Sequence, residues 1–194
     1  MGRVRSLRTT IGFLAGMGVT TFGLFILPQI LGRASFFVTA SGTRLLLTLV
    51  VSTIVGGIVS GLSIVPVRRG MVAFALAFPL GLFLPFLLVL NARTLSGLEP
   101  PFVVLLGTQL TFGLSFGVLG GLATSCLGRG WSLTVRAAIV FAGSGTVGGT
   151  IFGLATILHL IPDSNATLFM VIIFAAFLGP AALAGHQFGL LLRN

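Results

Sequence analysis

The chain has 194 residues, of which 56% are hydrophobic and only 7% are charged, and its formal net charge is +9. Soluble domains carry about 25% charged residues, so this composition excludes an ordinary soluble domain and indicates a membrane protein. All eleven basic residues are arginines, scattered between apolar runs rather than clustered as nucleic-acid binding requires. We therefore expect the lipid bilayer as a partner, and no nucleic acid. The lone Cys126 excludes an internal disulfide, and no spacing of His, Cys or acidic residues predicts a metal or a cofactor.

Six apolar stretches are long enough to cross a hydrocarbon core of about 30 Å, which takes roughly 20 helical residues. Because these runs are continuous rather than alternating, they predict helices and not barrel strands. The predicted fold class is an all-α membrane protein, a six-helix polytopic transmembrane bundle that forms a single domain over residues 1–194. The predicted helices cover approximately residues 10–30, 45–65, 71–91, 102–126, 137–158 and 168–190.

The first apolar run follows the basic segment MGRVRSLRTT and exceeds the apolar region of a signal peptide, which spans about 7–15 residues. We expect a retained helix; a signal peptide cleaved after Ala40 is the alternative. With the N-terminus inside, eight of the eleven arginines fall on the inner side, and both acidic residues fall on the outer side. The positive-inside rule then predicts a multi-pass protein of the cell (inner) membrane with both termini cytoplasmic. The inner arginines are Arg3, Arg5, Arg8, Arg68, Arg69, Arg129, Arg136 and Arg193.

Glycines four residues apart recur in the apolar runs, and two runs read G-x-x-x-G-x-x-x-G. Glycines at this spacing fall on one helix face and let another helix backbone approach closely, which drives helix association in lipid. The sequence therefore predicts helix packing of the glycine-zipper type. The predicted packing residues are Gly57, Gly61, Gly113, Gly117, Gly121, Gly145, Gly149, Gly153 and Gly185.

An internal repeat is a further hypothesis. The second, fourth and sixth predicted helices each carry two small residues four apart, followed eight residues later by an arginine. The pattern predicts three repeated helical hairpins, and internal repeats are frequent in transporters. Chance is the alternative, because the chain has 28 glycines and inner arginines follow any even-numbered helix. The three sets are Gly57, Gly61 and Arg69; Gly117, Gly121 and Arg129; and Ala181, Gly185 and Arg193.

Polar residues near the predicted outer ends of the helices are the candidate ligand-binding groups: Asn91, Gln109, His159 and Asp163. His159 and Asp163 are four residues apart and could meet on one helical face, although Pro162 intervenes. The alternative is a polar cap that faces water at the interface. No carboxylate lies inside a predicted helix, which disfavours a pump that relies on a membrane-buried acid.

Ser144 and His186 have similar predicted depths, about 11–12 Å from the inner boundary at 1.5 Å per residue. Residues 142–145, Ala-Gly-Ser-Gly, resemble the G-x-S-G motif of rhomboid proteases, with Ala142 in place of the leading glycine. A late histidine in the last helix also resembles that family. The resemblance implies an intramembrane serine hydrolase, but a motif outside its structural context is weak evidence, and we expect no enzyme and no catalytic residue.

Three functional hypotheses follow from these observations. The first is a small permease-like or solute-binding transporter subunit for an uncharged or apolar small solute. In size and topology the chain is similar to the S-components of energy-coupling-factor vitamin transporters. The second hypothesis is a non-transporting subunit that packs against partner membrane proteins or against other copies in a homo-oligomer. The third is the rhomboid-like hydrolase.

Overall fold

The computed structural model describes residues 2–26, 42–64, 66–90, 100–158, 160 and 166–192, and these residues contain helices and turns but no strand. The predicted all-α class and the number of helices are confirmed for this part of the chain. The short π-helix η1 (Phe22–Ile26) directly continues the first helix. The α-helices are α1 (Gly2–Thr21), α4 (Gly42–Gly61), α5 (Val67–Leu90), α7 (Pro101–Cys126), α8 (Trp131–Ile157) and α9 (Ala166–Leu191).

Two helices begin well before the predicted apolar spans. Helix α1 starts at Gly2 rather than near Thr10, and α8 starts at Trp131 rather than near Ala137. Both extensions contain arginine, which is a good helix former although it is excluded from the apolar core. The apolar run therefore marks the part of a helix that suits lipid, and not the helix itself.

Four of the six helices are long and apolar enough to cross a membrane, judged by length and composition. The other two fall short among the described residues: α4 has only a shorter apolar stretch, Leu47–Gly61, and α1 begins with three arginines within eight residues. Four such helices indicate a protein embedded in a membrane. The four candidate spans are Val67–Val89, Pro101–Cys126, Trp131–Ile157 and Thr167–Leu191.

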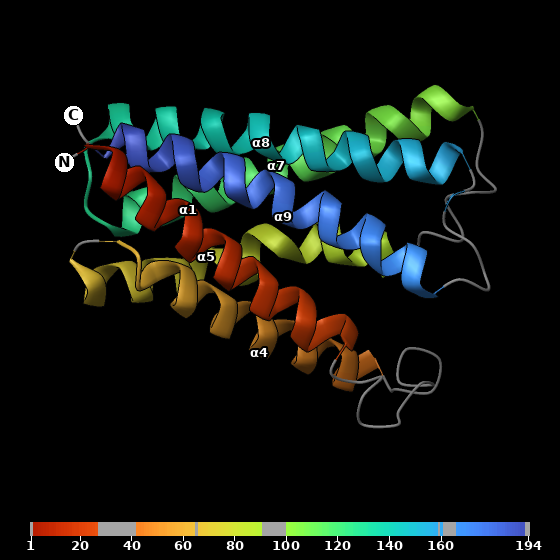
Figure 1. Cartoon of the computed structure of the whole chain (residues 1–194), viewed down its shortest axis with the longest axis horizontal. Helices are drawn as coiled ribbons and strands as arrows, with labels where there is room; N and C mark the ends of the chain where they lie inside the picture. Colours follow the sequence, from red (N-terminus) through yellow and green to blue (C-terminus); the bar gives the residue numbers. More distant parts are fainter. Residues whose placement is uncertain are drawn as a thin grey trace.

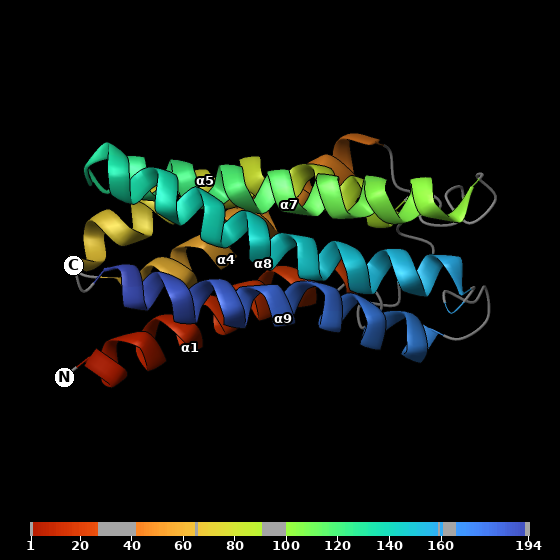
Figure 2. The same ribbon diagram turned by 90° about the horizontal axis from the view of Figure 1, so that it is seen from above.

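The helices run side by side along the longest axis of the molecule (Figures 1 and 2). Each packs against its neighbours in the chain, and α9 returns to pack against α1, so that the contacts close a ring. The starts of α1, α5 and α8 and the ends of α4, α7 and α9 gather at one end of the bundle (Figure 1). We call it the arginine end. Its described arginine side chains are those of Arg8, Arg68, Arg69, Arg129 and Arg136.

Close helix contacts depend on small residues. Gly113 and Gly117 of α7 lie against α8: a Cβ added at Gly113 would be 2.8 Å from Thr146 Oγ1, and one at Gly117 would be 3.2 Å from Ala142 Cβ. In the other direction, a Cβ at Gly145 would be 2.7 Å from Phe116 Cβ. Real Cβ atoms essentially never approach a neighbour within 3.0 Å, so Gly145, which also faces the backbone of Phe112, has room for glycine alone, whereas a Cβ at Gly113 would require the Thr146 hydroxyl to move.

Candidate functional site

Phenylalanine side chains fill the centre of the ring, and those nearer the arginine end form one layer. Phe13 of α1 is the hub of this layer: its ring centroid lies 5.0 Å from that of Phe74 and 5.4 Å from that of Phe141, both in edge-to-face geometry. Phe188 of α9 contacts all three rings, at centroid distances of 5.6 to 6.1 Å. These distances are typical of favourable aromatic pairs. We call Phe13, Phe74, Phe141 and Phe188 the arginine-end layer.

A second phenylalanine layer lies nearer the opposite end of the bundle. Phe86 of α5 stacks on Phe177 of α9, with centroids 4.6 Å apart and an interplanar angle of 11°. Phe112 of α7 lies 5.3 Å from Phe177 and 6.0 Å from Phe152 of α8. All four side chains have 0% exposure. We call Phe86, Phe112, Phe152 and Phe177 the opposite layer.

The two layers are built by a shared spacing. Helices α5, α8 and α9 each place one phenylalanine in each layer, and the two residues are 11 or 12 positions apart. Eleven residues make about three helical turns, so the pairs on α8 and α9 each fall on one helix face, whereas the twelve-residue pair on α5 is turned by about 120° around the helix axis. The layers are separated by about 16–18 Å along these helices. The pairs are Phe74 and Phe86, Phe141 and Phe152, and Phe177 and Phe188.

Both small and large side chains are buried along the helices between the two layers. Ala77, Ala181 and Ala184 are fully buried there, and Ser144 is 6% exposed. The Ser144 hydroxyl donates a hydrogen bond to the carbonyl of Val140, one helical turn away, at 2.9 Å. Larger side chains also occupy this level, among them Phe78, whose ring lies 6.2 Å from that of Phe74. The level is closely packed in this structure: Phe78, Leu82 and Phe116 are also buried there, so large side chains would have to move to open it.

Proline interrupts both helices that meet in the stacked pair of the opposite layer. Pro85 directly precedes Phe86 in α5, and Pro180 lies three residues after Phe177 in α9. A proline inside a helix removes a backbone donor and leaves the carbonyl four residues earlier without its helical partner. For Pro180 that carbonyl belongs to Ala176. Its oxygen faces Gly148 of α8, where an added Cβ would also lie 2.7 Å from Pro180 Cγ. The stacked rings are thus carried by two helices with weakened hydrogen-bond ladders.

Of the four predicted ligand-binding residues, the structure describes one. Gln109 is half-buried, and its Nε2 donates a hydrogen bond to Thr150 Oγ1 at 3.0 Å. Thr150 in turn donates to the carbonyl of Thr146 at 2.8 Å. Gln109 therefore bridges α7 and α8. Asn91, His159 and Asp163 lie outside the described residues.

His186 has a serine partner, but that partner is on α1. Ser6 Oγ lies 2.7 Å from His186 Nδ1, and Ser6 is 2% exposed. The neighbouring Thr9 hydroxyl donates to the carbonyl of Gly185 at 2.8 Å, so polar contacts join the first and last helices where the ring closes. The recorded hydrogen bond of Ser144 is instead the one within α8.

The predicted packing glycines lie at helix contacts, each against a definite partner. Gly57 and Gly61 face α5, and Gly185 faces Thr9, Thr10 and Phe13 of α1. The remaining six lie between α7 and α8: Gly113, Gly117 and Gly121 face α8, while Gly145, Gly149 and Gly153 face α7.

The chain matches no protein family model, no curated protein and no solved structure. The site must therefore be interpreted from its own geometry. The phenylalanine layers were not anticipated, although their signal is present in the sequence. Pairs of phenylalanines 11 or 12 residues apart occur in four separate apolar runs, and three of these pairs contribute one side chain to each layer.

Proposed function

We propose that the chain is a small permease-like or solute-binding transporter subunit for an uncharged or apolar small solute. In this proposal the solute occupies the level between the arginine-end layer and the opposite layer. Each layer closes one end of the path, and the described structure corresponds to a state in which both are closed.

The observation that carries the proposal is the double set of phenylalanines on α5, α8 and α9. A transporter needs two closures that open alternately around one site, and transporter sites often lie where helices are interrupted. The opposite layer has its stacked pair, Phe86 and Phe177, on two proline-containing helices.

The class of solute follows from the groups between the layers. The sequence of α5 after Arg69, of α7, of α8 after Arg136 and of α9 contains no Asp, Glu, Lys or Arg. An ion placed there would lose its hydration without gaining a counter-charge, which is costly in a low-dielectric interior. Ser144 supplies a hydroxyl, and the alanines and phenylalanines supply apolar surface. This lining suits a neutral solute with few hydrogen-bonding groups.

We also propose that the bundle consists of three repeated hairpins, α1–α4, α5–α7 and α8–α9. The contacts between hairpins support this proposal because they repeat around the ring. In each hairpin, small residues of the second helix face the first helix of the next hairpin. Gly57 of α4 faces α5, Gly117 of α7 faces α8, and Gly185 of α9 faces α1. The first helices supply Phe13, Phe74 and Phe141, which meet around Phe188. The repeat predicts that rotation about the axis of the ring superposes the three hairpins on one another. Failure of the hairpins to superpose would contradict it.

We also propose that the protein lies in the cell (inner) membrane and that its arginine end faces the cytoplasm. The support is the positive-inside rule, since the helix ends and connections that meet at this end hold Arg8, Arg68, Arg69, Arg129 and Arg136. A cysteine placed beside Arg129 should then react with an impermeant thiol reagent only in inverted vesicles.

Native mass spectrometry of the protein purified in mild detergent tests the function. We expect a retained small neutral molecule, and we expect Ala181→Leu to lose it by filling the space between the layers. Ala175→Leu is the matched control, because Ala175 is on the same helix but exposed. Thermal melting confirms that both variants fold. Loss of the molecule from both folded variants, or from neither, would contradict the proposed location.

The same preparation distinguishes the other hypotheses. A stoichiometric second polypeptide without a retained solute would support the non-transporting subunit. Labelling of Ser144 by a fluorophosphonate probe would support the rhomboid-like hydrolase, because only an activated serine reacts with such a probe.

A further inference from the structure

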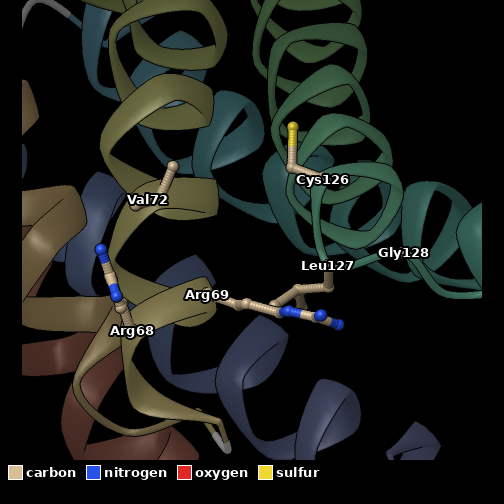
Figure 3. A pocket seen from close by; sticks show the side chains of 6 residues that line it. All are labelled: Arg68, Arg69, Val72, Cys126, Leu127 and Gly128. Carbon is tan, nitrogen blue, oxygen red and sulfur yellow. The ribbon is translucent and has the colours of Figure 1, made fainter.

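An open hollow lies at the arginine end, between the start of α5 and the end of α7. It has a volume of about 490 Å³ and is lined by Arg68, Arg69, Val72, Cys126, Leu127 and Gly128. Figure 3 shows the Arg69 side chain extending from α5 towards Leu127, with Cys126 on the α7 side of the hollow. Arg68 and Arg69 are both exposed. None of the residues that line the hollow belongs to either phenylalanine layer.

Among the described residues, no acidic side chain lies at the hollow. Arg68 and Arg69 occupy the first turn of α5, where the positive end of the helix dipole disfavours cations and where no acidic residue is present. Neither guanidinium makes a hydrogen bond or an ion pair with the described part of the chain. Two neighbouring arginines thus occupy an electrostatically unfavourable position, and their side chains extend to different sides of α5 (Figure 3).

The two acidic residues of the chain cannot neutralise this charge. Glu99 precedes Pro101, the first residue of α7, whereas the hollow lies at the other end of that helix. Twenty-six helical residues separate the two ends by about 39 Å. Asp163 follows the end of α8 in the sequence, whereas the start of α8, at Trp131, lies at the same end of the bundle as the hollow. The 27 residues of α8 therefore separate Asp163 from the hollow by a similar distance. At this distance salt screens the interaction almost completely, since the Debye length is about 8 Å at physiological ionic strength.

We infer that the hollow binds a phosphate-bearing anion, supplied by the headgroup of an anionic phospholipid. Guanidinium groups match phosphate oxygens in bidentate geometry, and the start of α5 adds backbone N–H groups that favour an anion. The candidate spans of α5 and α7 begin or end beside the hollow, at Val67 and Cys126, which is the depth of lipid headgroups. Val72 and Leu127 supply apolar wall for the lipid's glycerol and upper acyl carbons.

The single native thiol makes this inference testable, because Cys126 lines the hollow and is exposed. The full chain is reconstituted in nanodiscs of phosphatidylcholine, with or without phosphatidylglycerol, and the rate of reaction of Cys126 with a neutral maleimide is measured. A third arm adds inorganic phosphate to phosphatidylcholine nanodiscs, which separates a lipid headgroup from a soluble phosphate. Arg69→Gln is compared with Arg136→Gln, which removes an exposed arginine at the same end that does not line the hollow.

We expect phosphatidylglycerol to slow the labelling of the native chain, and Arg69→Gln to raise about fivefold the lipid fraction needed for half-protection. Arg136→Gln should respond like the native chain. If inorganic phosphate also slows the labelling of Cys126, and Arg69→Gln weakens that effect, the result would support the same anion site with a soluble phosphate as its ligand. An anionic surface also slows thiol reactions by lowering the local pH, but that effect would act on both variants equally. Equal responses of the two variants, or no protection in any arm, would overturn the inference.

Discussion

Gly145 provides a stringent test of how closely α7 and α8 approach. It is buried on α8, and an added Cβ would lie 2.7 Å from Phe116 Cβ and 2.9 Å from the carbonyl carbon of Phe112. Carbon atoms prefer separations of about 3.5–4.0 Å, so Gly145→Ala requires the helices to move apart by up to about 1 Å. Phe112 belongs to the opposite layer, so its backbone cannot shift alone.

The expected cost of Gly145→Ala can be bounded from both sides. Overpacking a core typically costs about 1–3 kcal/mol, and the higher helix propensity of alanine returns up to about 1 kcal/mol. Two of the three atoms nearest the added Cβ belong to the Phe112 backbone, so the overpacking cost should lie in the upper part of its range, and we expect a net loss of about 1–2 kcal/mol in the free energy of unfolding. Gly143→Ala is the matched control on the same helix: Gly143 is exposed, and an added Cβ would have no neighbour within 4 Å. That variant should be neutral or slightly more stable.

The assay is thermal unfolding in a mild detergent, followed by circular dichroism. For a chain of this size 1 kcal/mol corresponds to about 2–4 °C in Tm, so Gly145→Ala should melt about 2–8 °C below the native chain. Gly143→Ala should melt at or above the native temperature. If Gly145→Ala melts with its control, the close approach of α7 and α8 in this structure is wrong.

Three further variants test individual contacts by the same melting assay. Phe177→Ala should lower the free energy of unfolding by about 3–5 kcal/mol, because it opens a cavity in the opposite layer. Phe102→Ala, at a side chain that is 68% exposed, should change it by less than about 0.5 kcal/mol. Equal losses of stability in the two variants would contradict the opposite layer. Ser6→Ala should cost about 0.6 kcal/mol by losing its contact with His186, and the loss should disappear in a His186→Ala background. Gln109→Leu should cost a similar amount through Thr150, and Gln187→Leu, at an exposed position on α9, should cost nothing measurable; a larger loss for Gln187→Leu would argue against the bridge.

The sequence predicted the helices well because backbone groups in lipid must be satisfied within each segment, so a continuous apolar run leaves only one regular structure. The location of His186 shows where such prediction fails. Counting residues from the inner arginines gives the depth of a side chain along its helix, but not the direction in which it points around the axis. Depth alone puts Ser144 level with His186, whereas in the structure Ser6 is the serine that contacts His186. Ser6 lies outside the predicted apolar span, which begins at Thr10, because its helix already begins at Gly2.

The phenylalanine layers illustrate the same limit from the other side. The spacing of Phe141 and Phe152 shows that both fall on one face of α8, but not that this face points to the centre of the bundle. That information comes from the helices around it, since Phe13 and Phe112 meet those rings from α1 and α7. Contacts between distant segments depend on the order of the helices in the ring, and a single sequence does not specify that order.

Accessibility of a cysteine between the two layers tests the central claim most directly. Ser144→Cys is introduced into a Cys126→Ala background, and labelling by a membrane-impermeant thiol reagent is measured in vesicles of both orientations. With both layers intact we predict little labelling from either side. Phe177→Ala should admit the reagent only from the side opposite the arginine end, and Phe141→Ala only from the arginine end. Labelling from the same side in both variants, or in neither variant, would contradict a path closed by two phenylalanine layers.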